Sequence, residues 1–165
     1  MKKIVLAGGC FWGVEGYFDQ LKGVLDTSTG YVDGNKKNPT YKEVCNGIAT
    51  HAEAIEVTYD ENLTSLETLL DHFFRIINPF SLNRQGHDIG RQYRTGIYYT
   101  DPEDATRIVD FMNQHFGLDI KKVRTEVKLC LDYELAEEYH QDYLKKNPNG
   151  YCHVDMGLAA PEEKK

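Results

Sequence analysis

The chain has 165 residues, the length of one ordinary domain, and its 41% hydrophobic and 27% charged residues are typical of a globular protein. Its formal net charge of −7 and the lack of a basic stripe exclude a general electrostatic affinity for nucleic acid. No apolar run is long enough to cross a membrane, and the first residues lack the long apolar core of a signal peptide, so we expect a cytoplasmic protein.

Strands and helices are predicted from the periodicity of apolar residues, beginning at the N-terminus. The apolar run 4–7 indicates a buried strand, and apolar residues at helical spacing predict a helix that begins near Cys10–Trp12. Alternation over 52–59 predicts a half-buried strand. A capping box at Thr64–Glu67 opens a helix with an apolar stripe that reaches Ile77. The later elements are a strand over 95–99, a helix capped by Asp101-Pro102, a strand over 123–130 and a helix over roughly 134–146.

Strands interleaved with helices predict an α/β (α+β) fold, a two-layer sandwich of a mixed β-sheet and packed helices that is ferredoxin-like in character. Segments 26–48 and 78–94 show no periodic pattern, so we expect loops there, and loops of this length are usually functional. Residues 1–160 are expected to form a single catalytic domain, and residues 161–165 a frayed C-terminal tail.

Four cysteines in a chain expected to be cytoplasmic make thiol chemistry the first question to ask. None belongs to a CxxC pair, and the six histidines show no ligand spacing, so we expect no metal or other cofactor. Cys45, in a turn that contains Asn-Gly, and Cys130, at a strand end, are interpreted as structural.

Cys10 is the candidate nucleophile. It follows Gly8-Gly9 at the predicted strand-to-helix turn, where free N–H groups and the helix dipole favour a thiolate. The alternative is a buried structural cysteine. Phe11 and Trp12 beside it would suit an apolar substrate group, unless both rings belong to the core.

Glu53 is the candidate general acid. It has the same parity as Ile55 and Val57 in the predicted strand, so its carboxyl points toward the apolar face. Burial raises the pKa of a carboxyl, which suits proton transfer near neutral pH. The alternative is a strand-end glutamate that twists out to solvent, which is the commoner location of this residue.

Four further candidates lie in or beside irregular segments. The hydroxyls of Tyr41 and Tyr93 could donate hydrogen bonds to a substrate oxygen, although plain packing is the simpler interpretation from these residues alone. Asp88 is typical of a turn. Cys152 lies on a segment rich in Pro, Asn and Gly, which indicates mobility, so it could reach Cys10 and form a disulfide; the spacing alone does not show that the two meet.

An ordered set of motifs along nearly the whole chain resembles the A-type peptide methionine sulfoxide reductases. The hallmark is the pentapeptide Gly9-Cys10-Phe11-Trp12-Gly13. The match continues through Asn38-Pro39-Thr40-Tyr41, Val44-Cys45, His51-Ala52-Glu53, Gln85-Gly86, Asp88, Gly90, Gln92-Tyr93-Arg94, Ala136-Glu137, Tyr139-His140-Gln141, Asn147-Pro148 and Gly150-Tyr151-Cys152.

The resemblance implies a function and a role for each candidate. The expected activity is thiol-dependent reduction of methionine S-sulfoxide, free or in oxidised proteins, with thioredoxin as reductant and no cofactor. By resemblance, Cys10 is the nucleophile and Cys152 resolves its sulfenic acid. Phe11 and Trp12 hold the substrate methyl group. The remaining roles implied are protonation of the sulfoxide oxygen by Glu53 with help from Tyr41 and Tyr93, and ordering of that network by Asp88.

Two other functions remain open from the residues. Cys10, His51 and Asp88 could form the nucleophile, base and orienting group of an acyl-transfer enzyme. Trp12 and the tyrosines could instead form the interface of a protein-binding module without catalytic activity. An acyl-enzyme would support the first, and a Cys10 pKa near that of a free thiol without turnover would support the second.

Overall fold

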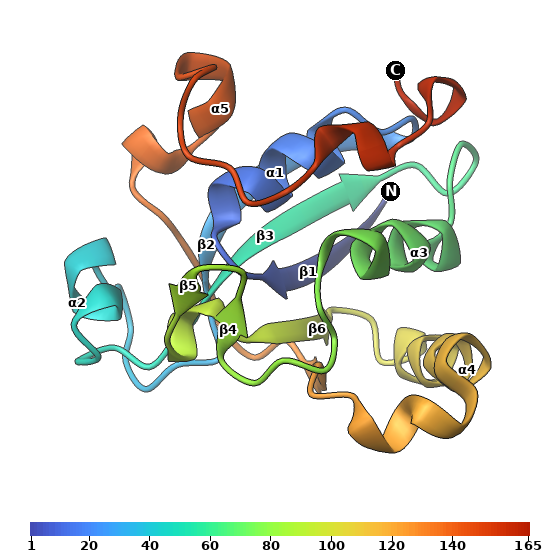
Figure 1. The fold of residues 1–165 in the computed structure, drawn as a ribbon, viewed down its shortest axis with the longest axis horizontal. Helices are drawn as coiled ribbons and strands as arrows, with labels where there is room; N and C mark the ends of the chain where they lie inside the picture. The colour runs from blue at the N-terminus through green and yellow to red at the C-terminus, as the bar shows by residue number, and fades with distance from the viewer.

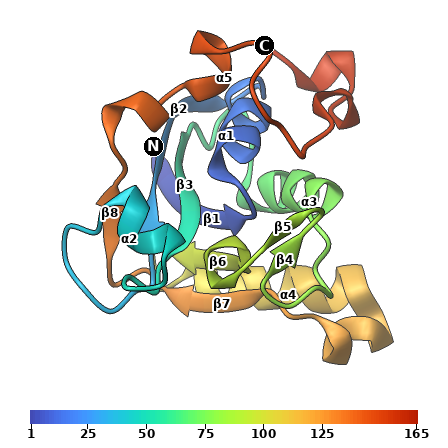
Figure 2. The same ribbon diagram turned by 60° about the vertical axis from the view of Figure 1, so that its left-hand side comes forward.

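The structure is a computed structural model that describes all 165 residues. Six strands form one curled, mixed sheet in the order β7-β6-β1-β3-β2-β8, in which only the β6–β7 pair is parallel (Figure 1; β7 and β8 are labelled in Figure 2). Their bounds are β1 Lys2–Gly8, β2 Val24–Val32, β3 Ala52–Tyr59, β6 Thr95–Tyr99, β7 Glu126–Leu129 and β8 Tyr133–Leu135. A separate two-stranded hairpin pairs β4 (Arg84–Gln85) with β5 (Asp88–Ile89).

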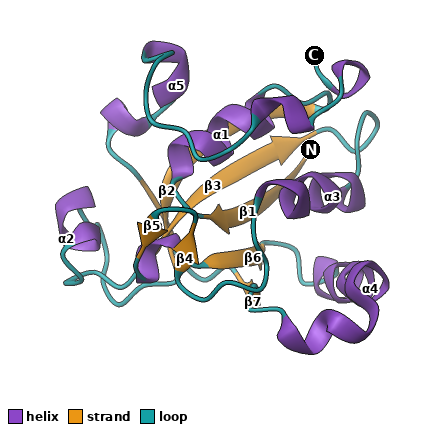
Figure 3. Cartoon of the chain, in the orientation of Figure 1, coloured by secondary structure: helices purple, strands orange, loops and turns teal.

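Five helices accompany the sheet (Figure 3). They are α1 Phe11–Asp19, α2 Tyr41–Cys45, α3 Leu66–Ile76, α4 Asp104–Phe116 and α5 Tyr143–Lys146. Short 3-10 turns occupy Arg91–Tyr93, Gly117–Lys122, Glu138–His140, Met156–Leu158 and Pro161–Glu163. No helix is both long and apolar enough to span a membrane.

The hydrophobic core lies between one face of the sheet and helices α1 and α3. Inward side chains of β1 and β3, such as Ile4 and Ile55, belong with the apolar stripe of α3 to one cluster of 27 buried residues. The other face carries a smaller cluster of six buried residues, which includes Val5 and Ala54. The predicted two-layer arrangement of helices on a mixed sheet is therefore confirmed.

The expected loop at 26–48 was wrong for its first part, because β2 occupies Val24–Val32 between β3 and β8. Asp, Thr, Ser and Gly dominate this strand, so its sequence lacks an apolar alternation. Its backbone nevertheless pairs with β3 along its length, apart from an irregularity between Val24 and Asp26, and its last three residues, Gly30–Val32, also pair with β8. Hydrogen bonding to the neighbouring strands β3 and β8 therefore makes this segment a strand, although its own sequence does not predict one.

The expected helix over 134–146 was also wrong. Strand β8, a 3-10 turn and the four-residue helix α5 take its place. The amide of Gln141 bonds the backbone of Thr29 and Ala136, which ties this segment to the edge of the sheet. Asp142 then adopts a left-handed conformation with φ +52°, and its N–H donates to the Glu15 carboxyl instead of continuing a helix.

Three boundaries differ in detail. Helix α3 is capped by Ser65, whose hydroxyl accepts from the N–H of Thr68, so Thr64 is not the cap. Helix α4 begins at Asp104, after a turn in which the Asp101 carboxyl accepts from the N–H of Glu103. The strand expected over 123–130 pairs only at Glu126–Leu129.

The last five residues, for which a frayed tail is expected, make contacts with α1 and α3. The Glu163 carboxylate accepts two hydrogen bonds from the guanidinium of Arg75 on α3. The N–H of Lys165 donates to the carbonyl of Gln20, at the end of α1. Figure 2 shows the C-terminal segment running beside α1.

Candidate active site

Cys10 lies where β1 turns into α1 and is the N-cap residue of that helix, 7% exposed. The turn depends on Gly9, which has a φ of +87°. A Cβ at Gly9 would lie 2.8 Å from the Cβ of Gln85 and 2.9 Å from Nε2 of His153. Glycine is therefore required both by the backbone conformation and by the close approach of the hairpin and the C-terminal segment.

The surroundings of the Cys10 sulfur act on its pKa in opposite directions. Burial raises the pKa most, and the negative charge of Glu53 raises it further, whereas the N–H groups of Trp12 and Gly13 lower it. The net pKa is well above that of a free thiol. The prediction that the helix start favours a thiolate is correct for the N–H groups but wrong for the net effect, because desolvation outweighs them.

Glu53 points into the protein from the start of β3 and is 1% exposed. Its Oε1 accepts from the N–H of Phe11 at 3.2 Å, and its Oε2 accepts from Nε2 of Gln92 at 2.8 Å. Burial, the largest cause, raises the pKa of Glu53 to about 7 against these two hydrogen bonds. The burial and raised pKa predicted from strand parity are confirmed, and this carboxyl can hold or release a proton at neutral pH.

Gln92 is a functional residue that was not predicted from the sequence. It is 9% exposed, and its side-chain NH₂ reaches both Glu53 and, at 3.5 Å, the sulfur of Cys45. Its position next to Tyr93 in the Gln92-Tyr93-Arg94 motif was the available signal. Cys45, interpreted as structural, is an exposed thiol that also contacts the Tyr41 hydroxyl, so it adjoins the acid network.

Tyr41 and Tyr93 come from α2 and from the 3-10 turn at 91–93, at the open side of this network. Burial, followed by the charge of Glu53, raises the pKa of both phenols, so each remains a neutral O–H donor at pH 7. Neither hydroxyl donates to Glu53 itself. The Tyr93 hydroxyl has no hydrogen-bond partner and keeps a donor for a substrate oxygen, whereas the Tyr41 hydroxyl faces the Cys45 sulfur and would have to turn from it to a substrate oxygen.

Aromatic rings line the side of Cys10 that faces α1 and α5. Phe11 is fully buried, with its ring centroid 6.3 Å from that of Tyr41. Trp12 is partly exposed, stacks on Tyr143 at a centroid distance of 3.8 Å, and donates its Nε1–H to Nδ1 of His140 at 2.9 Å. His140, another residue to which the sequence alone assigned no role, fixes the orientation of the indole.

Asp88 and Cys152 are brought to the mouth of the site from separate segments. Asp88 lies on β5, and its Oδ2 accepts from the hydroxyl of Tyr151 at 2.8 Å. The thiol of Cys152 is free and donates to the carbonyl of Val154 at 3.2 Å. Asp88 thus bonds the segment that carries Cys152, and it bonds neither Glu53 nor Tyr41 nor Tyr93. It acts on Cys10 only through its negative charge, which raises the pKa of the thiol.

The acyl-transfer arrangement of Cys10, His51 and Asp88 is not assembled. The buried ring of His51 packs on Gly34, and its Nε2 lies 3.7 Å from Asp132. Asp88 is bonded to Tyr151 instead. No group of three or more His, Cys, Asp or Glu side chains is arranged to hold a metal ion.

Comparisons with known proteins agree with this site. A family model described as peptide methionine sulfoxide reductase matches residues 2–165. The chain is 52% identical over 159 residues to the peptide methionine sulfoxide reductase MsrA of Ureaplasma urealyticum, and the match covers 96% of each chain.

Two crystallised proteins show the same fold. Methionine sulfoxide reductase A of Corynebacterium diphtheriae superposes with a TM-score of 0.87 at 33% identity, over 99% of this chain and 82% of that one. Reduced Mxr1 of Saccharomyces cerevisiae gives 0.83 at 35% identity, over 98% and 90%. Mxr1 in complex with Trx2 gives 0.58 at 23% identity, over 86% and 84%, a likeness of fold alone.

Proposed function

Since the chain belongs to the peptide methionine sulfoxide reductase family, we propose that it reduces methionine S-sulfoxide, free or in oxidised proteins, to methionine through Cys10. The observation that carries the assignment of roles is the pairing of a buried helix-capping thiol with a buried carboxyl whose pKa is about 7. A sulfoxide sulfur becomes electrophilic once its oxygen is protonated or strongly hydrogen-bonded, and this pair can supply both a nucleophile and a proton.

Near neutral pH the Cys10–Glu53 pair passes from two protons to one, because the pKa of Glu53 is about 7. The charge of Glu53 raises the pKa of Cys10, so the thiol keeps its proton while the carboxyl is ionised. The reactive form of the singly protonated pair is the opposite one, in which the Cys10 thiol has passed its proton to Glu53 and has become a thiolate. Substrate favours that arrangement, because a sulfoxide oxygen accepts a hydrogen bond from the neutral carboxyl but is repelled by the carboxylate.

The reduction step then balances within the site. The Cys10 thiolate attacks the sulfoxide sulfur, and Glu53 donates its proton to the oxygen, with Tyr41 and Tyr93 as further donors. The oxygen passes to Cys10 as sulfenic acid, and methionine leaves. Cys10 is oxidised by two electrons, and the methionine sulfur is reduced by two. The partly exposed Trp12 would hold the substrate methyl group beside Cys10, with Phe11, which is buried in the core, behind it.

Recycling requires a second thiol. Cys152 attacks the sulfenic acid, the S–O bond breaks, and water leaves as the Cys10–Cys152 disulfide forms. Thioredoxin then reduces this disulfide by exchange. We place this reaction in the cytoplasm, a reducing compartment in which thiols of this kind are kept reduced.

A single-turnover assay tests the function. Fully reduced protein is mixed with excess methionine sulfoxide, each sulfur epimer separately and without reductant. We expect one methionine per protein from the S epimer, together with the loss of two thiols out of four. The proposal would be disproved if neither epimer gave methionine.

A further inference from the structure

The segment that carries Cys152 is attached to α1 at two places. Before α5, the N–H of Asp142 donates to the Glu15 carboxyl at 2.8 Å. After the cysteine, the carbonyl of Met156 accepts from Nε2 of Gln20 at 3.1 Å. We call residues 143–155 between these two bonds the resolving arm. Because both ends are fixed to the same helix, the arm cannot slide along α1 as a unit.

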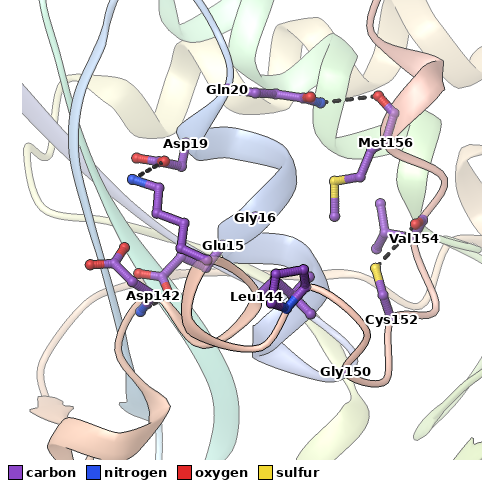
Figure 4. Close-up of a pocket in the computed structure, with 12 residues that line it drawn as sticks. Glu15, Gly16, Asp19, Gln20, Asp142, Leu144, Gly150, Cys152, Val154 and Met156 are labelled. Atoms are coloured by element: carbon purple, nitrogen blue, oxygen red, sulfur yellow. Dashed lines mark hydrogen bonds and ion pairs between the residues drawn. The ribbon is translucent and has the colours of Figure 1, made fainter.

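Two glycines on α1 receive this arm. Gly13 faces Cys152 and its two successors, and Gly16, one helical turn later, faces Leu144 and Met156. Figure 4 shows Cys152, Val154 and Met156 along a cavity of about 420 Å³ between α1 and the arm. Neither glycine has a positive φ, so the backbone of α1 would accept alanine at both positions.

The contacts at Gly13 are unusually close. A Cβ there would lie 3.1 Å from Cγ2 of Val154, 3.2 Å from the sulfur of Cys152 and 3.4 Å from Nδ1 of His153. These are three consecutive residues, and Val154 is only 7% exposed. One side-chain rotation therefore cannot relieve all three contacts, so a methyl group there would push Cys152 and its neighbours a few tenths of an ångström from the helix.

We infer that Gly13 is a positioning residue for disulfide formation: its missing side chain forms the seat that holds Cys152 against the first turn of α1, within reach of Cys10. Cys10 caps this helix, and the N–H of Gly13 bonds the Cys10 sulfur, so Gly13 adjoins Cys10 through its backbone and Cys152 through its missing side chain. A seat at Gly13 thus keeps the two sulfurs within one helical turn. This inference rests on the proposed resolving role of Cys152.

The step that the seat serves is the attack of the Cys152 thiolate on the Cys10 sulfenic acid. The S–S bond forms, the S–O bond breaks, and the oxygen leaves as water, so no further oxidant or reductant enters. Attack requires the Cys152 sulfur in line with that S–O bond. A displacement of about 1 Å can cost such a step up to about 10²-fold.

The experiment compares Gly13→Ala with Gly16→Ala in the full chain. The two changes add the same methyl group to the same helix, against the same arm, but only the first touches Cys152. Reduced protein is mixed with excess methionine-S-sulfoxide, and methionine release and remaining thiols are followed over time. Gly13→Ala keeps the backbone N–H that faces Cys10 and should still release one methionine per protein, yet form its disulfide about 10-fold more slowly. A Cβ at Gly16 would lie 3.1 Å from Cδ1 of Leu144 and from Cε of Met156, the ends of flexible side chains that can turn aside, so Gly16→Ala should match the wild type in both.

A second variant, Gly13→Ala/Val154→Ala, removes the closest contact of the added methyl group. Disulfide formation should therefore recover in part. This variant also tests the inference if Gly13→Ala alone folds poorly. The inference is overturned if Gly13→Ala forms the disulfide at the wild-type rate, if both alanine variants are slowed alike, or if Gly13→Ala loses methionine release. Absence of methionine release from the wild type would instead refute the proposed function.

Discussion

The two halves of the site are built in different ways. The acid half is set in regular structure: Glu53 starts a central strand, is 1% exposed, and is held by hydrogen bonds from Phe11 and Gln92. The resolving half is an arm without strands, whose Tyr151 is 45% exposed. In the proposed mechanism the sulfoxide is therefore reduced beside side chains held by regular structure, whereas disulfide formation depends on how the arm presents Cys152.

This difference separates two properties that an overall activity measurement combines. Changes in the acid half should alter methionine release in a single turnover. Changes in the arm should leave that release intact and alter the rate at which the disulfide forms afterwards. We expect the largest effects where a reacting group is removed and the smallest where only the hold on the arm is loosened.

Cys10→Ser should abolish both steps, because a serine hydroxyl at this position is a far weaker nucleophile and forms no sulfenic acid. Methionine release in a single turnover measures the effect. The matched control is Cys130→Ser, whose thiol lies near a strand end and donates weakly to the Asp132 carbonyl; it should keep most of the activity. Substantial release by Cys10→Ser would show that another group is the nucleophile.

Cys152→Ser should remove turnover driven by thioredoxin but keep one methionine released per protein. Thioredoxin exchanges best with a disulfide, which this variant cannot form with Cys10. A small thiol at high concentration should restore part of the turnover by attacking the sulfenic acid directly. Peptide mapping of oxidised wild type should link Cys10 to Cys152, and a link from Cys10 to Cys45 or Cys130 would contradict the resolving role.

Glu53→Gln should slow methionine release by about 10²-fold or more, since the amide cannot supply the proton. In the wild type the rate should rise with pH through a midpoint near pH 7 and level off above about pH 8, as the Cys10–Glu53 pair loses the first of its two protons. The variant should lack this rise near pH 7. Glu56→Gln, a partly exposed carboxyl of the same strand, is the control and should behave as the wild type. Native rates in Glu53→Gln would place the proton donor elsewhere.

The same carboxyl makes stability depend on pH. Its pKa is about 7 in the folded protein and 4.5 ordinarily, so folding favours the protonated form. The stability gained is fully present below pH 4.5 and is lost as pH rises through 7. A shift of this size corresponds to at most about 3 kcal/mol. Between pH 5 and 8, denaturant unfolding should show the wild type losing stability relative to Glu53→Gln; a constant difference between the two would contradict the raised pKa.

The sequence predicted the acid half better than the arm, for a physical reason. Glu53 could be placed because a strand alternates its side chains between two faces, so its parity with Ile55 implied burial. Cys10 could be placed because glycines mark the strand-to-helix turn. In both cases, the neighbouring residues in the chain determine the orientation.

The failures involve partners far apart in the chain. Strand β2 is stabilised by pairing with β3 and β8, and the helix expected over 134–146 is interrupted where Asp142 bonds Glu15, 127 residues away. The net pKa of Cys10 likewise depends on burial and on Glu53, which the helix start alone does not reveal. The contact of Gln92 with Glu53 and that of Cys152 with Gly13 also join residues far apart in the chain, so neither could be predicted from the local sequence.

The smallest expected effect is that of Tyr151→Phe, which removes the one hydrogen bond from the arm to the hairpin. The bond to Asp88 is present in the reduced structure and therefore stabilises the arm before it moves. Its loss should speed disulfide formation by at most about fivefold, because bonds at exposed charged groups contribute about 1 kcal/mol or less. Methionine release should not change, since the phenol contacts neither Glu53 nor Gln92.

Asp88→Asn is the comparison: it also removes a charge that raises the pKa of Cys10, so it should alter methionine release as well. Slower disulfide formation in Tyr151→Phe would show that the bond instead guides Cys152 toward Cys10.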